Sequence, residues 1–330
     1  MRKRIAAFFC CLLIGSTLST GAYARELLVG GQAVGIQAAT AGVLVAGLTK
    51  VDTGGSSFSP AESAGIKKGD LIIALGGKVV KTASELIDAV TALEGRNVEL
   101  TLRREGKTLR INVQPIRSRE GQWMMGMWLR DGVTGIGTLT FCDPESGIYG
   151  ALGHGINDAE SGSKLPLAGG SITEAEIVSV TPGTPGQPGE LNGCADMGRV
   201  LGSIEGNTDH GIYGQAYGAL GSRIIETGEI APGPAIIIST VSGRTPMEYE
   251  VEINRVYQDS EGKHVMLTVT DTRLCSETGG IVQGMSGSPI LQNGKLVGAV
   301  THVFVNEPTR GYGVSINDML RSAGIEQRAA

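Results

Sequence analysis

The stretch that decides the fold is GMSGSPI at residues 284–290, which is followed by the apolar run LVGAV at residues 296–300. A serine two positions after a glycine, on a turn ahead of a strand, suits a nucleophile. Gly284 allows the chain to turn so that its own N–H and that of Ser286 point at one spot, where a tetrahedral oxyanion can be held. We therefore predict Ser286 as a nucleophile, with Gly284 and Ser286 forming its oxyanion hole.

Two other interpretations of this stretch remain open. Ser288 is an alternative nucleophile, but Ser286 rather than a glycine would then lie two positions ahead of it. A plain Gly-Ser turn between two strands is the other interpretation, and it would be preferred if the motif stood alone. The choice between these interpretations depends on whether the chain also supplies a base.

A serine nucleophile needs a general base, and the chain has 4 histidines. His154 lies between Gly153 and Gly155 at the end of an apolar run, where its ring can project into a cleft. The order of histidine upstream and serine downstream matches that of chymotrypsin, so we predict His154 as the base. We expect the other three histidines to be structural or solvated side chains, because they lie at a strand end or in polar or turn-rich surroundings. They are His210, His264 and His302.

The composition predicts a mainly β fold. The 330 residues include 51 Gly and 12 Pro, and so many glycines are incompatible with a helical bundle or coiled coil. A hydrophobic content of 41% is too high for a disordered chain, and the length suggests two domains. After residue 117, short apolar runs alternate with Gly-rich turns, a pattern typical of an all-β barrel or sandwich.

Charge and cysteine patterns exclude two kinds of site. The net charge is −5, and beyond residues 2–4 the basic residues form nothing longer than pairs, so nucleic acid is excluded as a partner. The cysteines outside the N-terminal apolar run lack C-x-x-C spacing, which argues against a zinc site. The sequence is compatible with one disulfide among these cysteines or with three free thiols. The cysteines are Cys142, Cys194 and Cys275.

The N-terminus is typical of a secretory signal peptide. A basic start at residues 2–4 precedes an apolar run at residues 5–14, which is too short to span a bilayer. Ala-Tyr-Ala at residues 22–24 matches a signal-peptide cleavage site. We therefore predict that residues 1–24 are a signal peptide and that the protein is exported.

Residues 30–116 resemble a PDZ domain of the kind attached to exported bacterial proteases. The resemblance rests on the order of short strands, a helix near residues 82–93 and the phrase AGIKKGD at residues 64–70. Such a module binds an extended peptide along a sheet edge beside the helix. The loop for the peptide carboxylate is expected at Val34, Gly35 and Ile36, and the pocket walls at Leu86 and Ala89; the alternative is that Leu86 and Ala89 are core residues.

The nucleophile motif resembles that of trypsin-like serine proteases, and longer motifs resemble the stage IV sporulation protein B peptidase family. These motifs are GHGI at 153–156, GSIEGN at 202–207, GIYG at 211–214, TGGIVQGMSGSP at 278–289, and the stretch from HVFVN at 302–306 to YG at 312–313. The resemblance implies a PDZ domain followed, over residues 117–330, by a trypsin-like double β-barrel serine peptidase domain. It implies no metal and no cofactor.

The resemblance also assigns the catalytic residues. It places the family serine at Ser286, the histidine at His154 and the proposed aspartate at Asp271, which follows an apolar strand and would orient the His154 ring. Asp271 lies much closer in sequence to the serine than the aspartate of chymotrypsin does. The alternative carboxylates are Asp158, Asp196 and Asp209.

The function implied by the resemblance is signalling during sporulation. Family members act between the inner and outer forespore membranes, where cleavage of a regulatory membrane protein triggers intramembrane proteolysis of a sigma-factor precursor. Membrane association and self-cleavage are further implications, although only a handful of residues separate Ala24 from the PDZ domain. The alternative is a non-enzymatic PDZ scaffold that binds the tail of a membrane partner.

Overall fold

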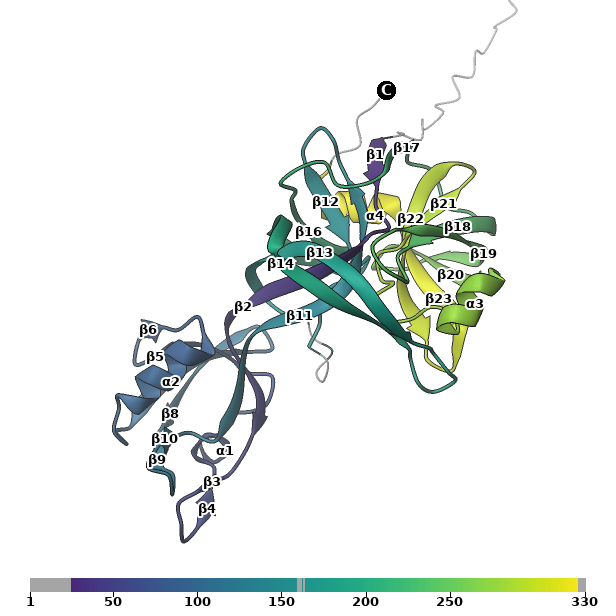
Figure 1. The fold of residues 1–330 in the computed structure, drawn as a ribbon. Coiled ribbons are helices and arrows are strands. Elements are labelled where there is room, and N and C mark those ends of the chain that lie inside the picture. Colours follow the sequence, from purple (N-terminus) through teal and green to yellow (C-terminus); the bar gives the residue numbers. More distant parts are fainter. Residues whose placement is uncertain (1–24, 159–161, 163, 326–330) are drawn as a thin grey trace, which may run out of the picture.

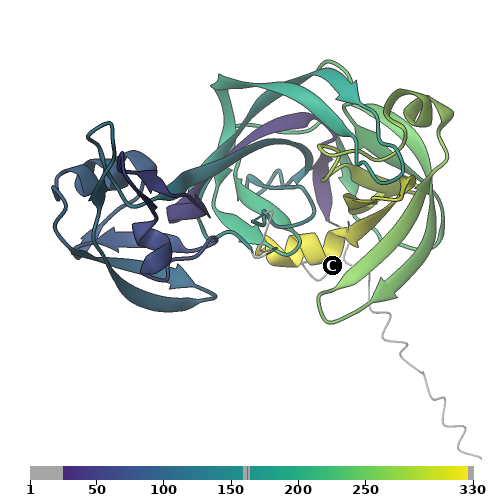
Figure 2. The same cartoon turned by 90° about the horizontal axis from the view of Figure 1, so that it is seen from below.

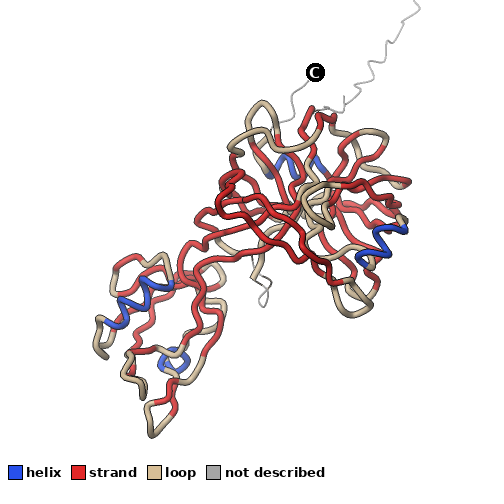
Figure 3. Tube along the Cα trace, viewed as in Figure 1, coloured by secondary structure: helices blue, strands red, loops and turns tan. Residues whose placement is uncertain are grey.

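The computed structural model describes residues 25–158, 162 and 164–325, so the predicted signal peptide lies outside the described residues. The described chain is mainly β, as predicted, and forms a large body and a smaller lobe joined by long strands (Figures 1 and 3). Within the described residues no helix is both long and apolar enough to cross a membrane. The cysteines named above are all free.

The C-terminal half of the large body is a closed barrel, here called barrel 2. Along β20 (Lys263–Val269) every second side chain points inward, and Val265 and Leu267 are fully buried in the barrel core. The helices α3 (Thr272–Thr278) and α4 (Ile316–Ser322) lie outside the barrel (Figure 1). Its strands in spatial order are β18 (Gly233–Ser239), β19 (Met247–Gln258), β20 (Lys263–Val269), β23 (Glu307–Ser315), β22 (Lys295–Phe304) and β21 (Pro289–Gln292).

The other half of the large body is a second barrel, barrel 1, seen end-on in Figure 2. Its strands in spatial order are β2 (Ala33–Leu48), β11 (Met127–Cys142), β12 (Ile148–Ala151), β16 (Gly211–Gln215), β14 (Glu190–Ile204) and β13 (Leu167–Thr181). A bridge between Gly202 and Ala216 closes the circuit between β14 and β16. Pairing at its edges adds β1 (Glu26–Val29), β15 (Gly206–Thr208) and β17 (Arg223–Glu226).

The smaller lobe, here called the PDZ lobe, has its own core between a sheet and α2. Thr82 caps α2 through a capping box with Glu85, and Leu86 and Val90 are buried under the helix. The elements of the lobe are β3 (Val51–Asp52), β4 (Ser57–Phe58), α1 (Pro60–Ser63), β5 (Leu71–Leu75), β6 (Lys78–Val79), α2 (Ala83–Thr91), β7 (Val98–Arg104), β8 (Lys107–Val113), β9 (Ile116–Arg117) and β10 (Trp123–Met124).

The strands β2 and β11 run through both bodies, which corrects the predicted domain boundary. Residues 34–40 of β2 pair with β13 in barrel 1, whereas Val43 and Leu44 pair with β5 in the PDZ lobe. The register between β2 and β11 shifts between Arg130 and Gly132, where the strands pass from one sheet to the other. The PDZ lobe is therefore inserted into a hairpin of barrel 1, and the predicted boundary at residue 30 is wrong because the first half of β2 belongs to the peptidase barrel.

If the PDZ lobe is an insertion, barrel 1 should fold without the lobe but not without β2. Ala39 pairs with Gly132, so replacing residues 40–131 by an Asn-Gly turn closes the hairpin without removing a strand of barrel 1. We expect this shortened chain to fold, with one cooperative transition when thermal unfolding is followed by circular dichroism.

The matched comparison is a chain that begins at Arg117 and lacks β1 and β2. It has lost a strand that pairs on both sides within barrel 1, so it should remain unfolded. A folded chain beginning at Arg117, together with an unfolded hairpin-closed chain, would contradict the insertion.

Candidate active site

The loop that carries Ser286, residues 279–288, is called the nucleophile loop and lies between the two barrels. Thr138 Oγ1 on β11 donates a hydrogen bond to the carbonyl of Gly284 at 2.8 Å. Thr140 Oγ1 donates to the carbonyl of Gly287 at 2.7 Å, and the N–H of Thr138 donates to the carbonyl of Ser286 at 3.0 Å. Both threonines are fully buried. Barrel 1 thus holds the nucleophile loop, which itself belongs to barrel 2.

The N–H groups of the loop follow the pattern expected of an oxyanion hole. Between residues 283 and 288, the N–H groups of Gln283, Met285, Gly287 and Ser288 all donate to backbone carbonyls. Within the described part of the chain, those of Gly284 and Ser286 have no protein acceptor. The φ of Gly284 is 96°, a left-handed conformation that favours glycine.

Ser286 and His154 line the same cavity of about 570 Å³ between the barrels. The Ser286 hydroxyl donates to the carbonyl of Thr301 at 2.6 Å. His154 follows β12 and is turned into the cavity by Gly153, whose φ is 68°. The structure therefore brings together the predicted nucleophile and the predicted base.

A backbone carbonyl orients the His154 ring. Nδ1 of His154 lies 2.8 Å from the carbonyl oxygen of Gly155, so Nδ1 carries the hydrogen and donates it. Nε2 is then left with a free lone pair, the form that a general base needs. Burial lowers the pKa of His154 below its usual value, and the bond to Gly155 opposes that shift.

A second histidine, His302, lies against the base. Its ring centroid is 4.3 Å from that of His154, with 31° between the ring planes. Desolvation in the cavity, together with the charge of a protonated His154, lowers the pKa of His302 to about 4, so the ring is neutral at pH 7. We expected His302 to be a structural or solvated side chain, although it lies in one of the stretches that carry the family resemblance.

Asp271 does not reach this cavity, so its predicted role as the orienting acid is wrong. Its carboxylate caps α3 by accepting the N–H of Arg273 at 2.8 Å, and it pairs with the Arg273 guanidinium at 2.6 Å. This pairing holds the pKa of Asp271 well below its usual range. Among the described residues that line the cavity there is no carboxylate, Asp158, Asp196 and Asp209 included, and the nitrogen that a triad aspartate would hold, Nδ1 of His154, bonds to the carbonyl of Gly155.

The predicted PDZ ligand residues also lie elsewhere. Val34, Gly35 and Ile36 are in the barrel 1 part of β2, and Ile36 lines the catalytic cavity. Leu86 is fully buried in the core of the PDZ lobe, and Ala89 packs against that core. The strands that contact α2 are instead β10 and β11. The predicted carboxylate loop is therefore wrong, since its residues are paired on both sides within barrel 1.

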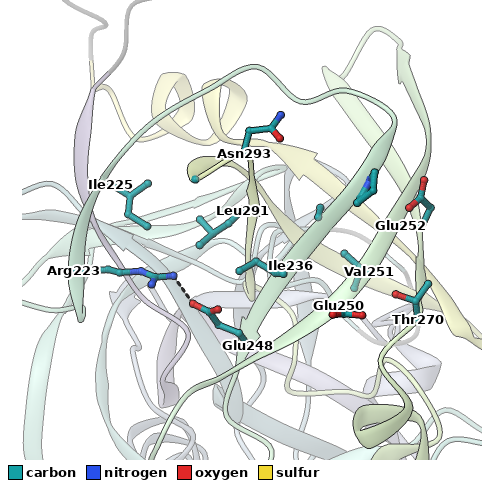
Figure 4. Close-up of a pocket in the computed structure, with 13 residues that line it drawn as sticks. Arg223, Ile225, Ile236, Glu248, Glu250, Val251, Glu252, Thr270, Leu291 and Asn293 are labelled. Atoms are coloured by element: carbon teal, nitrogen blue, oxygen red, sulfur yellow. Dashed lines mark hydrogen bonds and ion pairs between the residues drawn. The ribbon is translucent and has the colours of Figure 1, made fainter.

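A larger pocket of about 700 Å³ lies on the outer face of barrel 2 (Figure 4). Arg223 and Glu248 form an ion pair across it, and Glu250 and Glu252 continue the acidic edge along β19. Its lining contains neither histidine nor serine. This pocket therefore lacks the serine and histidine pair that lines the cavity between the barrels.

Comparisons with known proteins show which families the two parts of the chain resemble. A family model described as SpoIVB peptidase S55 matches residues 121–320, and one described as PDZ domain matches residues 51–104. Serine protease HTRA1 of Xenopus tropicalis is 44% identical over 57 residues, which are 17% of this chain and 12% of that protein. A probable periplasmic serine endoprotease DegP-like of Rhizobium meliloti (strain 1021) is 46% identical over 57 residues, which are 17% of this chain and 11% of that protein. The chain thus spans only a small part of these relatives.

A solved structure that matches this chain is the active form of the Rv3671c protease from M. tuberculosis. It has 13% sequence identity and a TM-score of 0.34, and the match covers 76% of this chain and 91% of that chain. The family matches confirm the predicted presence of a PDZ domain and a serine peptidase domain.

The first prediction from the site concerns Asp271. Because its carboxylate caps α3 away from the cavity, Asp271→Asn should leave kcat within about twofold of wild type, since asparagine is an equally good N-cap. Steady-state kinetics on a short peptide would test this. In a Ser-His-Asp triad the same change lowers kcat about 10⁴-fold, and a loss of that size would restore Asp271 to the site.

The second prediction concerns pH. Burial lowers the pKa of His154 below 6.5, and the protonated ring cannot accept the serine proton. The kcat/KM should therefore rise with pH through a midpoint below 6.5 and be level at pH 7. A midpoint at or above 6.5, measured at constant ionic strength, would contradict the desolvated environment of His154.

Proposed function

The chain belongs to the SpoIVB peptidase S55 family, and we propose that it acts as a serine endopeptidase in which Ser286 and His154 carry out the reaction. The family model matches residues 121–320, to which the first half of β2 adds a strand of barrel 1, and the PDZ model matches residues 51–104. One observation carries the proposal. A serine, a histidine of the correct tautomer and free N–H groups at Gly284 and Ser286 meet at a single cavity between two barrels.

The proposed reaction follows from these groups. Ser286 leaves the carbonyl of Thr301, attacks the scissile carbonyl and passes its proton to Nε2 of His154. The oxyanion is held by the N–H groups of Gly284 and Ser286. His154 then gives the proton to the leaving amine, while the carbonyl of Gly155 holds Nδ1–H in place. Water releases the acyl group by the same steps.

The walls of the cavity favour an aliphatic side chain in the substrate. The described lining contains no aspartate, glutamate, lysine or arginine. A charged side chain that entered would lose hydration without gaining a partner, which is costly. The aliphatic lining residues are Ile36, Val133, Ile136, Leu152, Ile156, Ile281, Val282, Val303 and Val305.

For the biological role, the proposal is regulated proteolysis during sporulation. Support comes from the family to which the chain belongs and from the pattern of a signal peptide at residues 1–24. In this proposal the enzyme is exported to the space between the inner and outer forespore membranes and associates with a membrane-protein complex. There it cleaves a regulatory membrane protein, which leads to activation of a sigma-factor precursor, while the PDZ lobe delivers the substrate.

The alternative of a non-enzymatic PDZ scaffold is tested by the same chemistry. A peptidyl diphenyl phosphonate with an aliphatic side chain should label Ser286, as seen by mass spectrometry, because the reagent needs an activated serine. Ser286→Ala should abolish labelling, and Ser286→Ala and His154→Ala should each lower peptide turnover on the order of 10⁶-fold, without additivity. The matched control is Ser276→Ala, an exposed serine on α3 that should change nothing.

The outcomes separate the proposals. Absence of labelling at any concentration would leave the scaffold and remove the peptidase. Equal labelling rates for aliphatic and acidic phosphonates would refute the aliphatic preference but leave the nucleophile in place.

A further inference from the structure

Ser288 is a second serine of the nucleophile loop, and its hydroxyl is not available as a nucleophile. The residue is fully buried, and its Oγ donates a hydrogen bond to the carbonyl of Met285 at 2.6 Å. The N–H of Ser288 donates to the same carbonyl at 3.0 Å. Resting on the proposed function, we propose that Ser288 is a positioning residue that aims the N–H of Ser286 at the oxyanion.

The peptide bond between Met285 and Ser286 is planar and trans. In a trans peptide the carbonyl and the following N–H point in opposite directions, so whatever holds one also aims the other. The Met285 carbonyl and the Ser286 N–H belong to one peptide unit. The hydroxyl of Ser288, at the shorter distance, and the N–H of Ser288 together hold that carbonyl, and the Ser286 N–H is therefore directed to the opposite side, where it has no acceptor among the described residues.

Because glycines flank this segment, the Met285–Ser286 peptide unit needs a hydrogen bond to fix its orientation. Gly284 and Gly287 lie on either side of the segment that contains Met285 and Ser286, and each has a φ of 96°. Glycine crosses between backbone conformations at little steric cost, so the peptide unit can rotate unless a partner fixes it. The other oxyanion donor, the N–H of Gly284, is aimed differently. The carbonyl on its peptide unit, that of Gln283, accepts the N–H of Leu191 on β14 at 2.8 Å.

The Ser288 hydroxyl has a fixed position of its own. Its oxygen lies 3.0 Å from the hydroxyl oxygen of Ser239, which ends β18 and is fully buried. Within the described part of the chain, the hydroxyl of Ser239 bonds to Ser288 and makes no hydrogen bond to Met285, so it acts on the oxyanion hole through Ser288. This makes Ser239→Ala a matched control that removes a buried hydroxyl nearby and leaves the donor to Met285 in place.

The test compares binding of the ground state with binding of the tetrahedral state. Removing a direct oxyanion donor lowers kcat about 10²- to 10³-fold, so loss of its positioning residue should lower kcat roughly tenfold or more. We expect Ser288→Ala to lower kcat by that amount with KM unchanged. A peptide aldehyde, which forms a tetrahedral adduct on Ser286, should bind more weakly by the same factor, whereas a cleaved product peptide should bind equally well.

Two variants guard against a purely structural effect. Ser239→Ala should keep kcat within about threefold of wild type, and Ser288→Cys, which retains a weak donor, should lie between wild type and Ser288→Ala. If Ser288→Ala does not fold by circular dichroism, the aldehyde and product affinities of Ser288→Cys decide the question in the same way.

Several results would overturn the inference. They are an unchanged kcat in Ser288→Ala, a rise in KM alone, and an aldehyde affinity that stays constant while kcat falls. In those cases the wild type remains an active peptidase and the proposed function stands. A wild-type chain that neither cleaves a peptide nor reacts with the phosphonate overturns the proposed function and, with it, the role of Ser288.

Discussion

The structure depends on the hydrogen bonds that β11 makes to the nucleophile loop. Thr138 and Thr140 lie in barrel 1, and the carbonyls that they hold belong to barrel 2. Each buried bond contributes about 1 kcal/mol net, but loss of a threonine hydroxyl would leave a buried carbonyl unsatisfied at a cost of about 1–3 kcal/mol. Neither barrel contains an active site alone, because the loop of one takes its conformation from a strand of the other.

The local chemistry of the site was predictable from the sequence, since it is written in short motifs. Gly284 lies two positions before Ser286, and Gly153 and Gly155 flank His154. Glycines at such positions indicate turns of the backbone that can expose a nucleophile or a base. The strand order around them was not predictable. Val34, Gly35 and Ile36 form an apolar, glycine-containing segment that suits a PDZ loop and a barrel strand equally well, and only pairing with β13 separates the two.

Asp271 shows a different limit of sequence reasoning. An aspartate ahead of a short helical segment is typical of an N-cap, and this local meaning is the one that the structure realises. Its assignment to the catalytic site came from resemblance, which carries no information on distance. The orienting group at His154 is a backbone carbonyl, which every residue possesses and which no side-chain pattern can reveal.

The insertion of the PDZ lobe between the halves of a hairpin has a consequence for folding kinetics. Ala39 and Gly132 are paired but lie about ninety residues apart, so closing that loop from an open chain costs roughly 4 kcal/mol of entropy. A lobe that has already folded brings the two strands to adjacent positions. The entropic cost of closing the loop then falls to that of a short turn, which is roughly 3 kcal/mol less. The inserted domain therefore lowers the effective contact order of barrel 1, and its early folding would accelerate assembly of the strand that later holds the nucleophile loop.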